Sequence, residues 1–437
     1  MQLPQNHPQR VELNDEVHAR PPEALVPPLR LTYLAMFTGG LPRELTWEYV
    51  CELTSRYGVP APSKGQNHFS ADLGPFRLKW ERHTEFNRYK FILNGADPDA
   101  PFASPALAAV PEDWVKALPG QVMVAAHAAL IRERHAEPDY EAIARQQFAG
   151  NVLIGSTLSG GAGRAFTDFR IQPDGFSRFL VEDRSMTPRQ AGRIMQRLLE
   201  IDTYRVMALL ALPVARELTP FLAEYERELA KITSALTSAG EREEPALLDR
   251  LTRLEAGIES RYVDTHYRFS AANAYYELVQ RRIAELREER IQGLQTFQEF
   301  TERRLAPAIS TCRTVSERQD TLSNRVARVT QLLSTRIDVA RKLQNQAVLA
   351  SMNRRAKMQL RLQQTVEGLS IAAVTYYIVG LVGYAAKGLK AGNLPIDPDI
   401  VVALSIPAIA LVVALGIRRV RRMVTPRGRK APVTKAA

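Results

Sequence analysis

Charged and titratable side chains gather in the short stretch from Trp80 to Glu85, which reads WERHTE. If this stretch is a β-strand, alternation places Glu81, His83 and Glu85 on one face. Two carboxylates and an imidazole at that spacing could bind a cation or respond to pH. The same composition is also typical of a strand face exposed to water, and we favour that interpretation over a binding site.

A second concentration of polar groups lies near the N-terminus, in the motif LNDEVHARPP at residues 13–22. Its side chains could contact a ligand or a partner, with His18 and Arg20 as polar handles. Because the two prolines end any helix there, the motif could instead be a capped turn that docks the N-terminus on the domain. We favour the docking turn. The candidate residues of the motif are Asn14, Glu16, His18, Arg20 and Pro21.

The residue patterns of common catalytic and metal sites are missing from the sequence. The seven histidines form neither HExxH nor a Cys/His zinc pattern, and there is no GxSxG elbow. The glycines between Gly155 and Gly163 suggest a phosphate loop, but no lysine follows them, so we expect a hairpin turn. His127 lies in an apolar strand, where a core histidine with satisfied hydrogen bonds is expected. We therefore predict no enzyme activity, no cofactor and no metal site.

The elements that position these residues form an α+β domain with α/β-type alternation over residues 1–185. A helix with proline near its start and glycine after its end is expected at 42–58. A second helix is expected at 139–148. Strands are expected at 29–38, 67–74, 75–82, 86–93, 121–131, 151–160, 163–171 and 175–183.

Residues 186–365 favour helix almost throughout. Thr187 can cap a helix that has Pro188 at its first position, and Gln190 can complete a capping box. Breaks in the helical region are expected at Pro213, at Pro220, between Ala239 and Pro245, and at Pro307.

A 3-4 spacing of mostly apolar residues runs from Leu305 to Ala350 and predicts a coiled coil or a helix bundle. The small and polar residues in this stripe indicate helix packing that is moderate rather than as tight as in a leucine zipper. Continued straight, the helix enters the first apolar segment, so this stalk and that segment are expected to be one helix. The pattern leaves open whether the helices pack within one chain or between chains. We expect a homo-oligomer formed through the stalk.

Two apolar segments near the C-terminus are long enough to cross a bilayer as helices, at residues 366–386 and 400–417. A short loop at 387–399 joins them, and a basic tail follows at 418–437. Arg and Lys cluster before the first segment and after the second, which places both termini in the cytoplasm. Two buried core helices of a soluble protein are the alternative interpretation.

The composition supports this topology. The chain has 437 residues and a net charge of +11, much of it beside the apolar segments, so anionic lipid headgroups are the expected partner. Nucleic acid is not expected, since the basic clusters lack interleaved aromatic residues. Two distant cysteines, Cys51 and Cys312, fit a reducing compartment. The N-terminus has no secretory h-region.

Four parts of the chain resemble the domain-of-unknown-function family 3422: LNDEVHARPP, WERHTEF, IDTYRVMALLALP and the double-span end. This is a group of predicted bacterial membrane-anchored proteins. The resemblance covers nearly the whole chain. It implies a multi-pass protein of the bacterial inner membrane, and it implies no particular activity.

The order of domains also resembles the CorA-type magnesium channels, in which the first span lines the pore of a pentamer. The family's Gly-Met-Asn signature corresponds here to Gly383, Tyr384 and Ala385, so only the glycine matches. Gly383 and Tyr384 could form a pore mouth, without the asparagine that contacts the hydrated cation.

The sequence therefore predicts a membrane-anchored protein with a scaffold, regulatory or binding role. A divergent CorA-like cation transporter is the alternative. An enzyme remains a third possibility only if His18 and Arg20 lie next to Glu81 and His83 in space.

Overall fold

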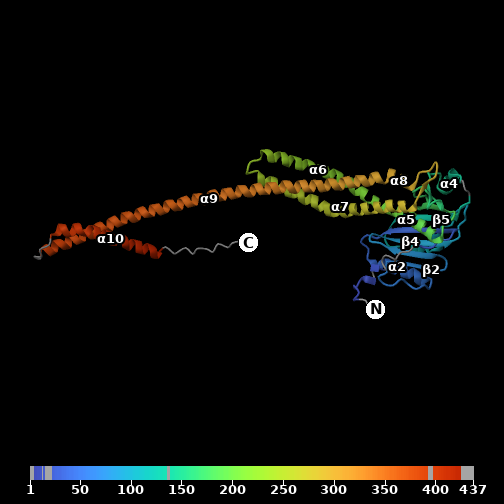
Figure 1. The fold of residues 1–437 in the computed structure, drawn as a ribbon, viewed down its shortest axis with the longest axis horizontal. Coiled ribbons are helices and arrows are strands. Elements are labelled where there is room, and N and C mark those ends of the chain that lie inside the picture. The colour runs from blue at the N-terminus through green and yellow to red at the C-terminus, as the bar shows by residue number, and fades with distance from the viewer. Residues whose placement is uncertain (1–3, 12, 15–21, 135–137, 392–396, 425–437) are drawn as a thin grey trace. The chain divides into compact units, whose positions relative to one another are not determined.

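The structure is a computed structural model that describes residues 4–11, 13–14, 22–134, 138–391 and 397–424. The chain divides into two compact units, Met1–Leu332 and Leu333–Ala437. The first contains a β-sheet with its covering helices and a helix bundle, and the second contains the two C-terminal apolar helical segments (Figure 1).

Within the described residues, nine strands form one sheet in the order β2-β3-β4-β1-β5-β8-β7-β6-β9. Neighbouring strands pair antiparallel except β5 and β8, which are parallel. Each of the eight predicted strands is present, with boundaries that differ by a few residues. The strands are β1 (Leu29–Phe37), β2 (His68–Asp72), β3 (Arg77–Arg82), β4 (Phe86–Asn94), β5 (Gln121–Arg132), β6 (Ile154–Leu158), β7 (Gly163–Thr167), β8 (Ser177–Asp183) and β9 (Glu289–Arg290).

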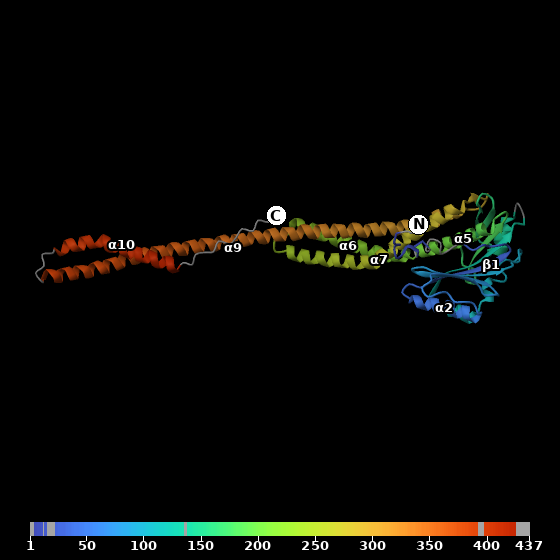
Figure 2. The same ribbon diagram turned by 60° about the horizontal axis from the view of Figure 1, so that its bottom comes forward.

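Helices cover both faces of the sheet. On one face, α2 (Arg43–Arg56) and α3 (Glu112–Lys116) bury Val50, Leu53 and Trp114 against apolar residues of β3 and β4. On the other face, α5 (Pro188–Leu209) packs against β1, and Tyr33 shares a hydrogen bond of 2.7 Å with Thr203. Figure 2 shows α2 and α5 on opposite sides of β1. The helix α4 (Tyr140–Gln147) packs against a smaller, separate cluster of buried apolar residues.

The glycine-rich stretch forms a tight hairpin turn, as predicted. It joins β6 to β7, and Ser159, Gly160 and Gly161 all have positive φ angles. A turn in this conformation favours glycine because residues with a Cβ rarely adopt it.

The start of α5 confirms the predicted cap. Thr187 Oγ1 accepts a hydrogen bond from Gln190 N at 3.3 Å, and Pro188 occupies the first turn. The next helices are α6 (Ala211–Ser238) and α7 (Glu244–Leu286). The predicted break at Pro220 is wrong, since this proline lies inside α6. The buried residues Leu218 and Leu222 on either side hold the helix against its neighbours despite the lost hydrogen bond.

The sequence interpretation missed a short non-helical stretch with a β-strand that interrupts the helical region. The helix α7 ends at Leu286, its C-cap Arg287 has a left-handed conformation, and β9 then pairs with β6 at the edge of the sheet. The helix α8 (Phe297–Arg304) follows, and Thr296 and Glu299 form its capping box. The sheet therefore includes residues from beyond the predicted boundary at 185.

The long helix α9 (Ala306–Ala391) begins in the bundle of the first unit. Its Arg318 pairs with Glu226 of α6 at 2.6 Å, and its Gln319 accepts a hydrogen bond from Thr265 of α7 at 3.2 Å. The first part of the apolar stripe thus packs within the chain. Its buried apolar members there are Cys312, Val315, Leu322 and Val326, and Ile309, next to the predicted position Ala308, is buried with them.

Among the described residues, three helical stretches are long and apolar enough to cross a membrane: Pro188–Ser238, Phe297–Leu389 and Pro398–Arg419. The first includes α5, whose apolar side chains belong to the core beneath the sheet. The last belongs to α10 (Pro398–Val424). Within the second unit, α9 and α10 approach closely at Gly383, where a Cβ atom would lie 3.2 Å from Val402 Cγ2.

Candidate functional site

A row of charged residues lies on the face of β3 and β4 that turns toward α5. The antiparallel register places Lys79 opposite Lys90 and Glu81 opposite Arg88. Because side chains alternate along a strand, all four share one face. The residues between them, including Trp80, belong to the apolar core on the other face. All four charged residues are buried.

Glu81 is the centre of this row. Its carboxylate lies 2.9 Å from Arg88, 3.4 Å from Lys79 and 4.0 Å from Lys90. Burial acts to raise the pKa of Glu81, but the three cations outweigh that effect and hold the pKa well below its usual range. Glu81 is therefore a permanent anion that offsets three buried positive charges.

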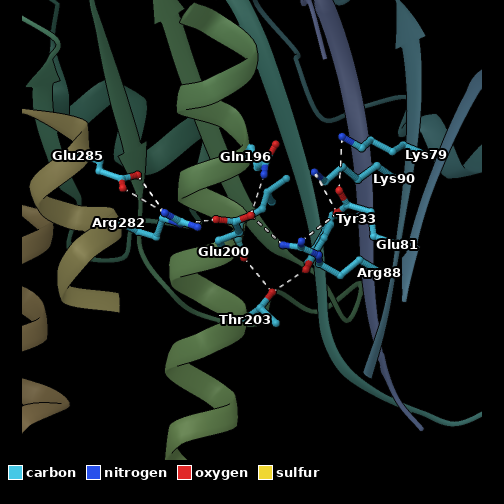
Figure 3. Close-up of polar contacts among 11 residues, drawn as sticks. Tyr33, Lys79, Glu81, Arg88, Lys90, Gln196, Glu200, Thr203, Arg282 and Glu285 are labelled. Atoms are coloured by element: carbon cyan, nitrogen blue, oxygen red, sulfur yellow. Dashed lines mark hydrogen bonds and ion pairs between the residues drawn. The ribbon is translucent and has the colours of Figure 1, made fainter. Parts of the chain in front are cut away.

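The network continues from the sheet into two helices, as Figure 3 shows. Arg88 also pairs with Glu200 of α5 at 3.0 Å, and Glu200 in turn pairs with Arg282 of α7 at 2.5 Å. Arg282 then pairs with Glu285 at 3.1 Å. Gln196 donates a further hydrogen bond to Glu200 at 2.8 Å. One chain of ion pairs therefore joins β3, β4, α5 and α7, and we call it the buried charge network.

The network contains more cations than anions. Lys79, Arg88, Lys90 and Arg282 face Glu81, Glu200 and Glu285. Burial, opposed in part by Glu81, lowers the pKa of Lys90 to about 8. The carboxylates are held in ion pairs, so the network acts chiefly as a structural connection between the sheet and the helices.

The predicted cluster of Glu81, His83 and Glu85 is not one strand face. The strand β3 ends at Arg82, so His83 and Glu85 lie in the turn before β4. Glu85 pairs with Arg268 of α7 and accepts a hydrogen bond from Tyr275 at 2.7 Å.

The prediction of a solvated face is also wrong, because Glu81 is 0 % exposed and Glu85 is 5 % exposed. The ring of His83 stacks on Phe86 with 4.6 Å between centroids. The helices α5 and α7 cover these residues, and the strand pattern alone did not reveal that cover.

The last residue of the N-terminal motif and the chain that follows it are docked beside the network. Pro22 lines a cavity of about 170 Å³ with Arg193, Gln196, Arg197, Glu200, Arg282 and Glu285. Glu23 pairs with Arg77 of β3 at 2.9 Å, and Leu25 N donates to Pro188 O at 2.9 Å. The contact with α5 is so close that a Cβ on Gly192 would lie 1.6 Å from the Glu23 carbonyl oxygen.

Only part of the motif itself can be placed. Asn14 lies in a short exposed helical stretch. The other candidates, Glu16, His18, Arg20 and Pro21, lie outside the described residues.

The candidate pore residues lie in α9. Gly383 is the point of close approach to Val402 of α10, and Tyr384 is exposed.

No group of three or more potential metal ligands occurs among the His, Cys, Asp and Glu side chains of the described residues.

Comparison with protein families places the chain. A family model described as "Protein of unknown function (DUF3422)" matches residues 5–424. The chain belongs to the DUF3422 family. The predicted resemblance is thereby confirmed, and the DUF3422 match includes the motif, the sheet, α5 to α9 and α10. No curated protein matches the chain.

The sequence interpretation missed Arg88, Glu200 and Arg282, the residues that link the sheet to the helices. A signal for two of them was present. Arg88 and Lys90 alternate with aromatic residues in β4, and Glu200 lies between the apolar residues Leu199 and Ile201 in α5. A charge in such surroundings is costly to bury unless it is paired, which predicts a partner.

Proposed function

We propose that this DUF3422 protein is anchored in the bacterial inner membrane, where its cytoplasmic sheet unit has a binding, scaffold or regulatory role. The observation that carries the proposal is the continuity of α9. This single helix, Ala306–Ala391, supplies residues to the bundle and also contains the apolar segment 366–386. A change within the bundle can therefore reach the membrane through one element.

We infer two membrane spans, from α9 and α10, rather than three. The apolar side chains of α5 are already used in the protein core. Those of the C-terminal segments are exposed, including Tyr376, Leu381, Leu404 and Leu411. An apolar surface of this extent is unusual on a soluble monomer, and lipid tails would cover it.

The basic flanks support cytoplasmic termini and contact with anionic headgroups. Residues 339–366 contain six Lys or Arg residues and no Asp or Glu. Each basic residue near an anionic membrane surface contributes about 1 kcal/mol of attraction.

Residues 341–366 are also exposed along the helix, which leaves apolar side chains such as Leu343 and Leu349 free to form the proposed homo-oligomer.

Extraction of the full-length protein from bacterial membranes with alkaline carbonate tests the anchor. We expect the protein to stay in the membrane pellet, and Leu381→Arg or Leu411→Arg to release part of it, since a central arginine costs about 2.5–3.5 kcal/mol. Leu212→Arg in α6 is the matched control and should not change extraction. Complete release of the unaltered protein would contradict the proposal.

The native mass in mild detergent separates the proposal from the CorA-like alternative. A monomer or dimer supports an anchored binding protein, because one lining helix per chain does not enclose a pore in so small an assembly. A pentamer that carries Mg²⁺ into liposomes, and loses this flux when Gly383 is replaced by valine, would favour the channel.

A further inference from the structure

A second cavity lies on the sheet face opposite the buried charge network. Its volume is about 320 Å³, within the range of small-molecule sites. The 3₁₀ helix η1 (Ala106–Ala109), the start of α3 and the strand β5 surround it. The lining is mostly apolar, and His127 and Glu112 are its ionisable members. The lining residues are Pro105, Leu107, Ala108, Val110, Glu112, Val115, His127 and Phe176.

The hydrogen bonds around Thr32 are compatible with a His127 tautomer that carries its proton on Nε2. Thr32 Oγ1 accepts a hydrogen bond from Leu107 N at 3.1 Å and lies 3.0 Å from His127 Nδ1. Its single hydroxyl proton can therefore go to Nδ1, and we assign the tautomer in which Nδ1 is the acceptor. The Nε2 atom then carries the imidazole proton. Burial lowers the pKa of His127 to about 4, so the ring is neutral at physiological pH.

The Nε2–H group of His127 is available to a ligand. His127 is 5 % exposed, and no acceptor for Nε2 occurs among the described residues. Nε2 is also not one of the enclosed side-chain atoms without a partner, so the cavity keeps it accessible. Phe176 stacks parallel to the imidazole at 3.9 Å and holds the ring in place.

We propose that this cavity binds a small, uncharged, mainly apolar molecule whose carbonyl oxygen accepts a hydrogen bond from His127 Nε2. The apolar lining selects the body of the ligand, and the single donor orients it. A carboxylate ligand is disfavoured because the imidazole is neutral and Glu112 lines the same cavity. A cationic ligand is disfavoured because an imidazole N–H cannot accept its hydrogen bonds and because Glu112 is already paired with Lys116 at 2.6 Å. The inference is independent of the membrane anchor.

Equilibrium dialysis of radiolabelled acetanilide against the full-length protein in detergent tests the site. Acetanilide is a neutral aromatic amide, and its partition into micelles is a non-saturable background that empty micelles measure. We expect saturable binding of one molecule per chain, with an affinity at least tenfold weaker in His127→Phe. Benzoate should compete at least tenfold less well than unlabelled acetanilide.

Two further variants keep the test decisive if His127→Phe folds poorly. Ala108→Trp places a large side chain at an exposed position of the cavity rim and should also abolish saturable binding. His266→Gln, at an exposed histidine of α7, should leave binding unchanged. An absence of saturable binding in the unaltered protein, or equal affinity in the Ala108→Trp variant, would overturn the proposal.

Discussion

Glu200 is the residue on which the buried charge network depends, because it lies between arginines of two different elements. It is 2 % exposed and contacts Arg88 of β4 and Arg282 of α7. Burial acts to raise its pKa, but the two guanidinium groups outweigh that effect and keep the pKa below its usual value. Glu200 is thus charged in the folded state at any pH near neutrality.

Replacement of Glu200 by glutamine should destabilise the first unit by about 3–5 kcal/mol, because Arg88 and Arg282 each lose one of their two anionic partners and the buried excess of positive charge grows. Urea unfolding followed by tryptophan fluorescence measures this, since the three tryptophans, Trp47, Trp80 and Trp114, all lie in the sheet region. The control is Asp249→Ala, which removes an exposed ion pair with Arg253 and should change the free energy of unfolding by less than about 0.5 kcal/mol. Equal effects of both substitutions would contradict this role.

Lys90 predicts an unusual pH dependence of stability. Its pKa is about 8 when folded and near the ordinary value of 10.5 when unfolded. Below pH 8 both states hold the proton, and the cost of burying the charge is fully present. Between pH 8 and pH 10.5 only the unfolded chain holds the Lys90 proton. The free energy of unfolding should therefore rise with pH in this range, by at most about 1.4 kcal/mol per pH unit.

Urea unfolding between pH 8 and 9.5 checks this, below the range in which exposed tyrosines ionise. The Lys90→Met variant lacks the titrating group and should show a flatter profile. Parallel profiles of the two proteins would show that Lys90 does not titrate in this range.

At the residue scale, the sequence predicted the charged side chains but not their environment. The spacing of Glu81 and His83 suggested a strand face in water, and the structure buries Glu81 instead. Burial depends on α5 and α7, which lie more than a hundred residues away in sequence. The partners Arg88 and Glu200 were detectable only as charges next to apolar or aromatic residues, and no local rule states which charges pair with each other.

At the scale of elements, Gly192 sets how closely the N-terminal segment packs on α5. Gly192→Ala should destabilise the first unit by about 1–3 kcal/mol, since the new Cβ atom would overlap the Glu23 carbonyl group. It should also speed hydrogen exchange at the Leu25 amide, which donates to Pro188 O.

Gly240→Ala is the matched control for this prediction. No heavy atom lies within 4 Å of the added Cβ there, so both observables should stay close to those of the unaltered protein. If Gly192→Ala behaves like Gly240→Ala, the close docking of Glu23 is incorrect.

The strands and the caps of the sheet unit were predictable because each has a local signal. Alternation and turn residues marked β1 to β8, and Thr187 marked the start of α5. The strand β9 has two residues, too few for any periodicity, and its place depends on pairing with β6. Pro220 shows the opposite error, because tertiary packing maintains a helix that local preference would interrupt.

At the scale of the whole molecule, the proposed topology predicts which residues face the outside of the cell. In a chain with Cys51→Ser and Cys312→Ala, the added substitution Asp397→Cys should react with a membrane-impermeant maleimide on intact cells. Asp397 belongs to the predicted external loop. Ser351→Cys, at an exposed position of α9 before the span, should react only after the membrane is permeabilised.

The two labelling results are interpreted together. Reaction of Ser351→Cys on intact cells, with protection of Asp397→Cys, would reverse the orientation. Reaction of both on intact cells would exclude a hairpin with cytoplasmic termini.

The place of β9 in the sheet bears on the order of events during synthesis. The edge strand β6 gains its partner only after the ribosome has added α5, α6 and α7, so a fragment that ends at residue 185 leaves this edge open. The first apolar segment follows α8 by roughly 60 residues, which takes about 3–12 s at the usual rate of translation. The pairing of β9 with β6 can therefore complete the sheet before the first apolar segment is presented to the insertion machinery.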